Sequence, residues 1–481
     1  MQSRSRDAGK RKWLTSAEPG VGVTLTAMAL VVIAGAVVAG AYGLLASPTR
    51  ILIYLLANLI LTFDMVDLGM RTWLKRLHGA AARGPSVDLG LQEISKVERT
   101  LLLRPYAVVA SVHDAADDID RFVAQLAPLK DVVWLIDDAS SDDTLLRLRR
   151  DGWNCMAGGT NRKKPGALLQ LLKALPSAIE TVLVLDPDVR WTVPPEQARA
   201  MLEEVIVDLQ RSSAAALTPR IQVTKGSWLA ECQALEYELA CGLGRKCLRD
   251  VACNSGVSLY RRAALEDALS RHSLSVYAED FENSLLLLAA GERIYYDDRL
   301  VIETDAKPTW KGLFSQRVGW SFGGAKLFSE RLTLVAAIAR HSPLGAYQYF
   351  FYLGLNGILL WPLKLATIAL LGMSFLRGVD DLLMTGLVPE ESWNEPMLFF
   401  LWYVKSTIVL LVACFVTLTP GERVRSLLTL PFYGIYTLLH YLPVTVGYLN
   451  LLTLRLLGRR LYADHYDANL RLRAAKAGDV P

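Results

Sequence analysis

The stretch VVWLIDDASSDDTLLRLRR, residues 132–150, carries the main signal for the fold. An apolar, β-branched run ends in Asp137 and Asp138, and a helical pattern follows a short polar turn. The unit recurs on either side, because YAVVASV (106–112) and TVLVLD (181–186) are further apolar runs that end in polar or acidic residues. Strands that alternate with helices predict an α/β fold with a mostly parallel, Rossmann-like sheet covered on both faces.

Long apolar segments flank this α/β region. Residues 22–46 carry no charge, and a second apolar run follows at 51–63 after a strongly basic start. These features predict a transmembrane hairpin whose first residues stay in the cytoplasm, so the next domain should be cytoplasmic too. A composition of 52% hydrophobic and 21% charged residues fits a soluble domain joined to membrane helices.

Five segments are expected along the chain. They are a basic N-terminus with two transmembrane helices (1–75), a cytoplasmic catalytic domain (100–310), interfacial amphipathic helices (310–345), C-terminal transmembrane or re-entrant helices (346–454) and a basic cytoplasmic tail (455–481). The last apolar stretch contains Pro431 and Pro443. Three full spans would place the basic tail outside, so we expect this stretch to be broken, re-entrant or interfacial. The predicted location is the plasma (inner) membrane, with several passes.

Acidic residues follow the predicted strands, where ligands bind in such sheets. Asp186 and Asp188 stand on either side of Pro187, which keeps both out of one strand ladder. Two carboxylates in this arrangement suit a hard divalent cation such as Mg²⁺ or Mn²⁺, although an isolated D-x-D is equally typical of a solvated strand-end turn. Glu279 and Asp280 open an apolar helical run. They are either helix-start acids or a general base at the edge of a cleft.

Two further segments offer groups that could hold a substrate. Residues 162–164 are basic and precede a helix expected from about Gly166, which suits phosphate, although a solvated basic loop has the same pattern. QRVGW, residues 316–320, places an amide, a guanidinium and an indole close together. It is either the start of an amphipathic helix or a platform for a substrate.

In their order and spacing, these motifs resemble the family 2 inverting glycosyltransferases with the GT-A fold, over about residues 104–325. The segment ACNSGVSLYRRAAL (252–265) is similar to the one that lies under the acceptor sugar in that family. The resemblance implies a catalytic base at Asp280, donor-binding residues at Asp138, Lys164 and Asp186, metal-binding residues at Asp188 and Asp186, and acceptor-binding residues at Glu279, Gln316, Trp320, Ser255 and Gly256.

The flanking membrane segments match the layout of hyaluronan, chitin and cellulose synthases. The resemblance therefore implies a hexosyltransferase that moves sugar from a UDP-sugar to a growing β-linked polysaccharide and secretes it. An enzyme that adds one or a few sugars to a lipid is the alternative, since Gly319 occupies the Arg position of the family's Q-x-x-R-W motif. An inactive membrane scaffold is a third interpretation. The expected partners are a nucleotide sugar, a polysaccharide or glycolipid acceptor and the lipid bilayer, with no nucleic acid.

Overall fold

The structure is a computed structural model that describes residues 94–275, 277–362, 364–365 and 420–464, with single positions and short pieces within 67–71, 376–385 and 404–418. The expected N-terminal hairpin and the tail beyond residue 464 therefore lie almost wholly outside the described residues. The chain divides into two compact units, one of Met1–Arg76 with Leu359–Ala413 and one of Leu77–Ile358 with Cys414–Pro481. The sheet and the candidate site belong to the second unit.

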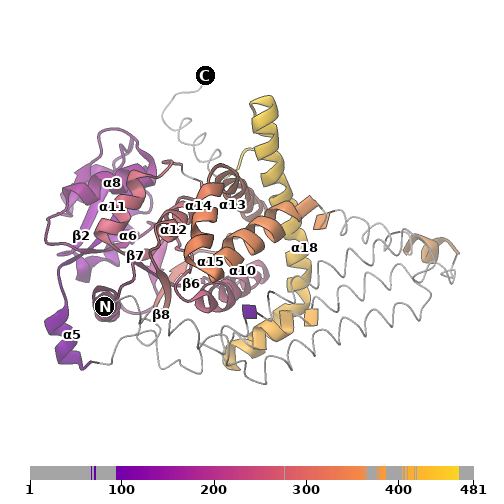
Figure 1. The fold of residues 1–481 in the computed structure, drawn as a ribbon, viewed down its shortest axis with the longest axis horizontal. Helices are drawn as coiled ribbons and strands as arrows, with labels where there is room; N and C mark the ends of the chain where they lie inside the picture. Colours follow the sequence, from indigo (N-terminus) through magenta and orange to yellow (C-terminus); the bar gives the residue numbers. More distant parts are fainter. Residues whose placement is uncertain are drawn as a thin grey trace. The chain divides into compact units, whose positions relative to one another are not determined.

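An eight-stranded sheet with the order β3-β2-β1-β4-β7-β6-β8-β5 forms the centre of this unit (Figure 1). The strands are β1 (Tyr106–Val112), β2 (Val133–Asp137), β3 (Cys155–Ala157), β4 (Thr181–Val184), β5 (Val189–Trp191), β6 (Ala216–Val223), β7 (Ser258–Arg261) and β8 (Ile294–Thr304). The three strands expected from the sequence are β1, β2 and β4, and each lies at the predicted residues.

The expectation of a mostly parallel sheet holds for one half of it. β3, β2, β1 and β4 run parallel, and Val112 pairs with Asp137 where β1 and β2 end together. In the other half, β6 and β8 run parallel to each other, whereas β7 is antiparallel to β4 and to β6, and β5 is antiparallel to β8. The sheet is therefore mixed. Acidic residues that follow β2 and β4 are brought to the same edge because these two strands both lie beside β1.

Helices cover both faces of the sheet. They are α5 (Lys96–Leu102), α6 (Ile119–Ala124), α7 (Thr144–Arg150), α8 (Lys163–Ala174), α9 (Pro195–Arg211), α10 (Trp228–Leu239), α11 (Arg262–Ser270) and α12 (Glu279–Ala289). Successive residues of a strand point to opposite faces. Accordingly Val109 of β1 packs in a core with Leu171 of α8, whereas Val108 packs in a second core with Phe122 of α6.

A helical segment follows β8 and ends at residue 359. It contains α13 (Trp310–Glu330), α14 (Leu332–His341), α15 (Pro343–Gly345) and the π-helical η4 (Ala346–Leu359). α13 begins where the Thr309 hydroxyl accepts a hydrogen bond from the Gly312 amide, at 3.2 Å. The predicted interfacial segment at 310–345 is thus helical.

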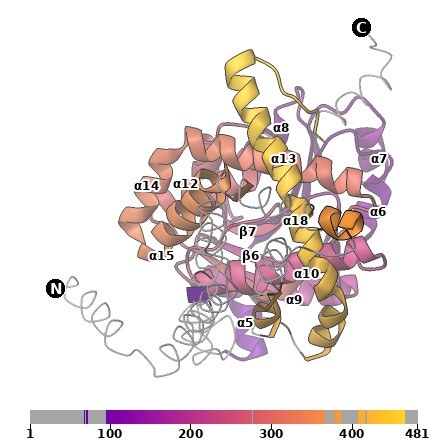
Figure 2. The same cartoon turned by 90° about the vertical axis from the view of Figure 1, so that its right-hand side faces the viewer.

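The last described helix, α18 (Pro420–Leu457), packs along α13 and α10 (Figure 2). It continues through Pro431 and Pro443, so the expected break in this stretch is not observed. Tertiary contacts with α13 help to hold the helix together across the positions where proline removes a backbone donor. A Cβ atom on Gly447 would lie 2.8 Å from the Val318 carbonyl oxygen, which shows how closely the two helices approach.

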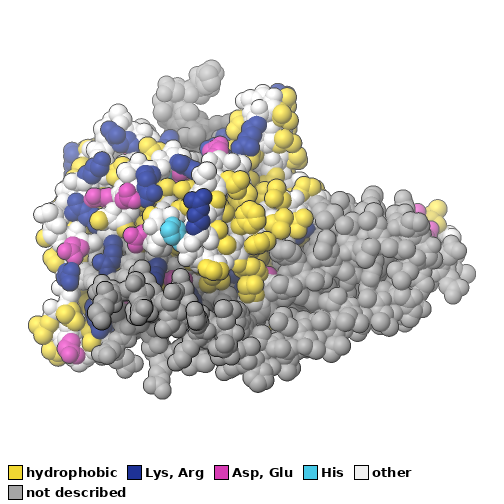
Figure 3. Space-filling model, viewed as in Figure 1, with side chains coloured by type: hydrophobic (Ala, Val, Ile, Leu, Met, Phe, Trp, Pro, Cys, Tyr) yellow, Lys and Arg dark blue, Asp and Glu magenta, His cyan; other side chains and the backbone are white. Residues whose placement is uncertain are grey.

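Apolar side chains are prominent on the surface of the helices that follow the sheet. Among the described residues, one helix, Ser426–Leu457, is long and apolar enough to cross a membrane. Figure 3 shows apolar side chains gathered over the region of α14, α15 and η4. Leu332, Phe350 and Phe351 contribute, and each is more than two-fifths exposed.

Candidate active site

A small pocket lies at the end of β4, between α8 and α12. It is lined by Lys164, Pro165, Leu168, Val184, Ser255, Gly256, Tyr260, Leu265, Glu279, Asp280 and Asn283. Five of these, namely Lys164, Ser255, Gly256, Glu279 and Asp280, are site residues predicted from the sequence. They come from three separate segments, with 115 residues between Lys164 and Glu279, and the fold places them around one space.

Lys164 lies at the centre of the charged groups in this pocket. α8 begins one residue earlier, and the Lys164 ammonium contacts both the Asp186 carboxylate and Glu279, with 3.1 Å to Glu279 Oε1. Burial disfavours the charged form of Lys164, but the carboxylates of Asp186 and Glu279 outweigh it and raise its pKa well above the ordinary value. The lysine therefore stays protonated and ties the first acid of the D-x-D motif to the start of α12.

Asp280 has the properties of a base. Its carboxylate Oδ1 accepts a hydrogen bond from the Phe281 amide at 2.8 Å. Burial, and then the negative charge of Glu279, raise the pKa of Asp280 to about 6, although Lys164 and Arg245 act in the opposite direction. A carboxylate whose pKa approaches the working pH is a more effective general base than an ordinary aspartate.

The backbone before Asp280 adopts an unusual conformation. Ala278, at the position just before α12, has a φ of 56° in the left-handed region, which a residue with a Cβ atom rarely adopts. Tyr277, one residue earlier, donates its hydroxyl to Asp464 Oδ2 at 2.9 Å, beyond the end of α18. Arg460 also donates to both of these side chains, at 2.5 Å to the Tyr277 oxygen and 3.1 Å to Asp464. These hydrogen bonds connect residues 460–464 to the loop that leads to Asp280.

Gly256 lies against the D-x-D motif. A Cβ atom on Gly256 would be 1.9 Å from Asp186 Oδ2 and 3.5 Å from the Lys164 ammonium. Any side chain at position 256 would displace the Asp186 carboxylate, so Gly256 forms a close wall beside Asp186 and Lys164. Ser255, the neighbouring predicted residue, donates its hydroxyl to the Val257 carbonyl at 2.7 Å. This bond stabilises the turn that presents Gly256 to the acids.

The charge balance at this pocket favours a cation. Among the described residues, Lys164 and, near Asp280, Arg245 face the carboxylates of Asp186, Glu279 and Asp280, and Asp188 adds a further negative charge near Asp186. Burial, and then the negative charges of Asp188 and Glu279, raise the pKa of Asp186 to about 7 despite the contact with Lys164. Asp188 is exposed and makes no hydrogen bond or ion pair to another described residue. Its carboxylate therefore suits a divalent ion, whereas Asp186 is already held by Lys164. The described residues contain no group of three acidic, histidine or cysteine side chains that would bind a metal by themselves.

Asp138 lies at the end of β2 and is 2% exposed. Its Oδ1 atom accepts a hydrogen bond from the Arg162 amide at 2.7 Å, which fixes the basic loop before α8. Nearby, Nε2 of the His113 ring lies 3.0 Å from the side-chain nitrogen Nδ2 of Asn161. Asp138 thus fixes the predicted donor-binding loop through a hydrogen bond from the loop's backbone.

Gln316 and Trp320 lie on α13 on either side of Arg317. Trp320 is 42% exposed, and the Arg317 guanidinium lies over its ring, 4.0 Å from the ring centre. Gln316 Oε1 accepts a hydrogen bond from Arg317 at 3.1 Å. Gly319 is buried within the helix, and no guanidinium occupies the position that the resemblance assigns to arginine.

The sequence matches a model of a known family over much of the region just described. The model, described as glycosyl transferase family group 2, matches residues 181–447, which is more than half of the 481-residue chain. The chain belongs to this family.

Several solved transferases are similar to this family 2 chain at low identity. The mannosyltransferase PcManGT from Pyrobaculum calidifontis, solved with GDP-mannose and Mn²⁺, is 16% identical, with 73% of this chain and 98% of that chain covered and a TM-score of 0.46. Glucosyl-3-phosphoglycerate synthase from Mycobacterium tuberculosis, with Mn²⁺ and UDP-glucose, is 17% identical, with 50% and 83% covered and a TM-score of 0.34. Residues 1–349 of TarS from S. aureus, with UDP, are 16% identical, with 61% and 90% covered and a TM-score of 0.32. No curated protein matches the chain.

The family 2 site includes residues that the sequence did not single out. Asn283 lines the pocket, and its Oδ1 atom is buried without a hydrogen-bond partner in the described structure. The same holds for both side-chain polar atoms of Asn254, beside Ser255. Arg245 lies close enough to lower the pKa of Asp280 and makes no ion pair with a described carboxylate. Asn283 lies one helical turn after Asp280, and this spacing could have predicted that both side chains face the same pocket.

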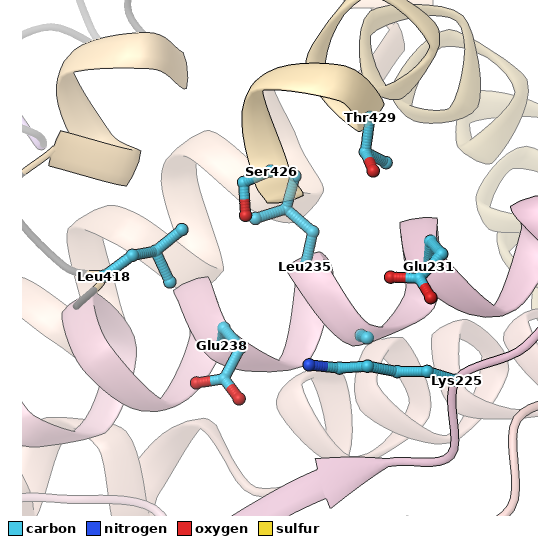
Figure 4. A pocket seen from close by; sticks show the side chains of 8 residues that line it. Lys225, Glu231, Leu235, Glu238, Leu418, Ser426 and Thr429 are labelled. Atoms are coloured by element: carbon cyan, nitrogen blue, oxygen red, sulfur yellow. The ribbon is translucent and has the colours of Figure 1, made fainter. Parts of the chain in front are cut away.

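A second pocket of the family 2 chain lies between α10 and the start of α18 (Figure 4). It is lined by Lys225, Glu231, Ala234, Leu235, Glu238, Leu418, Ser426 and Thr429. Figure 4 shows the Lys225 ammonium extending toward α10 among acidic side chains. None of the predicted site residues lines this pocket, so it is not the candidate active site.

Proposed function

We propose that this family 2 transferase is an inverting hexosyltransferase that takes a UDP-sugar and extends a β-linked polysaccharide at the plasma membrane, with its catalytic domain on the cytoplasmic side. One observation carries the proposal: Lys164, Glu279 and Asp280 line one pocket, Asp186 contacts Lys164 beside it, and the pKa of Asp280 is raised to about 6. This arrangement supplies a base and a binding site for diphosphate in the same space.

Asp280, Lys164 and Asp138 each have a defined task in the proposed reaction. Asp280 takes the proton from an acceptor hydroxyl as its oxygen bonds to the anomeric carbon of the donor, and the bond to the diphosphate breaks on the opposite face. The configuration at that carbon inverts, so an α-linked donor gives a β-linked product. Lys164 places positive charge where the diphosphate becomes more negative as it leaves, and Asp138 holds the basic loop beside it.

Asp188, with oxygens of the diphosphate, would hold Mg²⁺ or Mn²⁺, and Asp186 would lie next to the ion. A cation in this position neutralises charge on the departing diphosphate. Gln316 and Trp320 would contact the acceptor, as would the segment containing Ser255 and Gly256. The exposed indole of Trp320 offers a flat apolar face of the kind on which a sugar ring stacks.

A lipid acceptor is the second candidate, and the exposed apolar surface favours it. Leu332, Phe350 and Phe351 lie exposed on helices after the site, and an apolar surface of this kind suits contact with a bilayer. Gly319 also leaves out the arginine expected in a long-chain polymerase. The two candidates share the donor chemistry and differ in the acceptor.

The experiment is to incubate the detergent-purified full-length protein and Mn²⁺ with UDP-glucose, UDP-N-acetylglucosamine and UDP-glucuronate. We expect UDP release from one donor and a product whose size and solubility identify the acceptor: a long polymer for the synthase, or a short, lipid-extractable product for the second candidate. Asp280→Asn should abolish transfer and keep donor binding. Wild-type protein that binds a donor without turning it over would support an inactive scaffold.

A further inference from the structure

Arg317 uses its guanidinium entirely within the protein. The residue is 4% exposed, and its Nη2 donates to Glu236 Oε2 at 2.8 Å. Its Nε donates to His440 Nε2 at 3.2 Å, and its Nη1 donates to Gln316 Oε1. One cation therefore connects α10, α13 and α18, at the point where the Q-x-x-R-W segment lies.

The partners of Arg317 are themselves fixed. The Tyr436 hydroxyl donates to the same Glu236 oxygen at 2.6 Å. His440 accepts at Nε2, so its proton is on Nδ1, which lies 3.2 Å from the Tyr436 carbonyl oxygen and donates to it. Burial disfavours the charge of Glu236, but the Arg317 guanidinium and the hydrogen bond from Tyr436 reverse this and lower the pKa of Glu236 below its ordinary value. The Arg317–Glu236 pair therefore remains ionised at neutral pH.

The position of Arg317 determines how Gln316 and Trp320 are presented. The Gln316 carbonyl oxygen is engaged with Arg317, so its amide NH₂ group is the part left to donate to a substrate. One face of the Trp320 ring is covered by the guanidinium, which leaves the other face for a ligand. Gly319 carries no side chain that could do this in its place.

We propose that Arg317 is the positioning residue of the acceptor site. Held by Glu236 on α10 and His440 on α18, it sets the orientation of Gln316 and Trp320, and acceptor binding therefore depends on α18. This inference rests on the proposed function, because it assumes that the two side chains contact the acceptor. It also explains why Arg317 does not replace the arginine missing at position 319, since its guanidinium is directed to α10 and α18.

The test separates positioning from simple stabilisation. Arg317→Gln alone leaves the Glu236 charge without its partner, so the main variant is the double substitution Arg317→Gln with Glu236→Gln. UDP release from the three UDP-sugars is measured against increasing cellotetraose or chitotetraose, and in a separate arm against diacylglycerol in phosphatidylcholine vesicles. We expect the KM for the acceptor to rise about tenfold or more, the loss expected for a charge-assisted contact, with the KM for the donor and the acceptor-independent hydrolysis unchanged. Arg317→Lys should restore part of the acceptor affinity.

Arg220→Gln with Glu238→Gln is the matched control, because it removes another arginine–glutamate pair, which joins β6 to α10 at 2.6 Å. It should leave the KM for the acceptor unchanged. A double variant with the wild-type acceptor KM, or a control with an equal rise, would overturn the positioning role while leaving the transferase activity intact. Wild-type protein that releases no UDP from any donor would instead contradict the proposed function itself.

Discussion

Asp280 lies in surroundings that make its carboxylate more basic than that of an exposed aspartate. Its pKa is raised to about 6, first by burial and then by Glu279. As a base, Asp280 must be ionised, so we expect kcat/KM to be level above pH 6 and to fall about tenfold per unit below it. Glu279→Gln removes one cause of the raised pKa of Asp280, so the fall in kcat/KM should begin at a lower pH. The measurement is the pH profile of UDP release between pH 5 and 8.

The effect of the same group on stability has the opposite sign. The folded protein binds the Asp280 proton more tightly than the unfolded chain, whose aspartate has the ordinary value of 3.8. The contribution of Asp280 to the free energy of unfolding therefore increases as the pH falls through 6. A wild-type activity that stays flat across this range would contradict the assignment of Asp280 as the base, and a fall caused by acid unfolding would appear as a loss of stability at the same pH.

Gly256 gives the sharpest steric test of the site. A methyl group there would lie 1.9 Å from Asp186 Oδ2, so Gly256→Ala must push Asp186 away from Lys164. A displaced catalytic group can reduce the rate about a hundredfold, and we expect a loss of this order in UDP release. Gly244→Ala is the control, since a Cβ at Gly244 meets no atom within 4 Å. Equal activity in the two variants would show that the wall formed by Gly256 is not part of the site.

Among the secondary-structure elements, α13 and α18 approach each other closely at Gly447. Its Cβ would lie 2.8 Å from the Val318 oxygen and 2.9 Å from the Phe322 nitrogen, both backbone atoms of α13 that cannot rotate away. Gly447→Ala should therefore separate the helices and lower the free energy of unfolding by about 1–3 kcal/mol. Thermal unfolding in detergent measures this. Gly421→Ala, on the same helix in open space, should unfold like wild type, and identical curves for both variants would refute the close contact.

The elements also show how far local sequence can predict this fold. β1, β2 and β4 are short β-branched runs, and their pattern predicted them at the right residues. β6 was harder to predict because Pro219 lies within it, and the structure accommodates this proline where the register with β8 shifts between Pro219 and Arg220. The antiparallel insertion of β7 between β4 and β6 depends on pairings between distant segments, which no local pattern contains.

Across the whole molecule, some features of the candidate site could be predicted from local sequence, whereas others depend on contacts between distant segments. The acids at positions 186, 279 and 280 were found because strand and helix ends collect at one edge of a sheet. Their connection through Lys164 was not predicted, because Lys164 and Glu279 are 115 residues apart. Arg317 was visible in the sequence, but its partners Glu236 and His440 come from elements far along the chain. The local motifs identified the acidic side chains, and tertiary packing supplies their arrangement.

The contact between Tyr277 and Asp464 has a consequence for the order in which the enzyme is completed. Translation proceeds from the N-terminus, so the α/β domain has left the ribosome long before residue 464 is made. The loop that leads to Asp280 gains Arg460 and Asp464 as partners only when α18 has been synthesised and has packed along α13. The surroundings of Asp280 are therefore among the last parts of the described structure to be assembled. They are completed after α18, the helix that is apolar enough to enter a membrane.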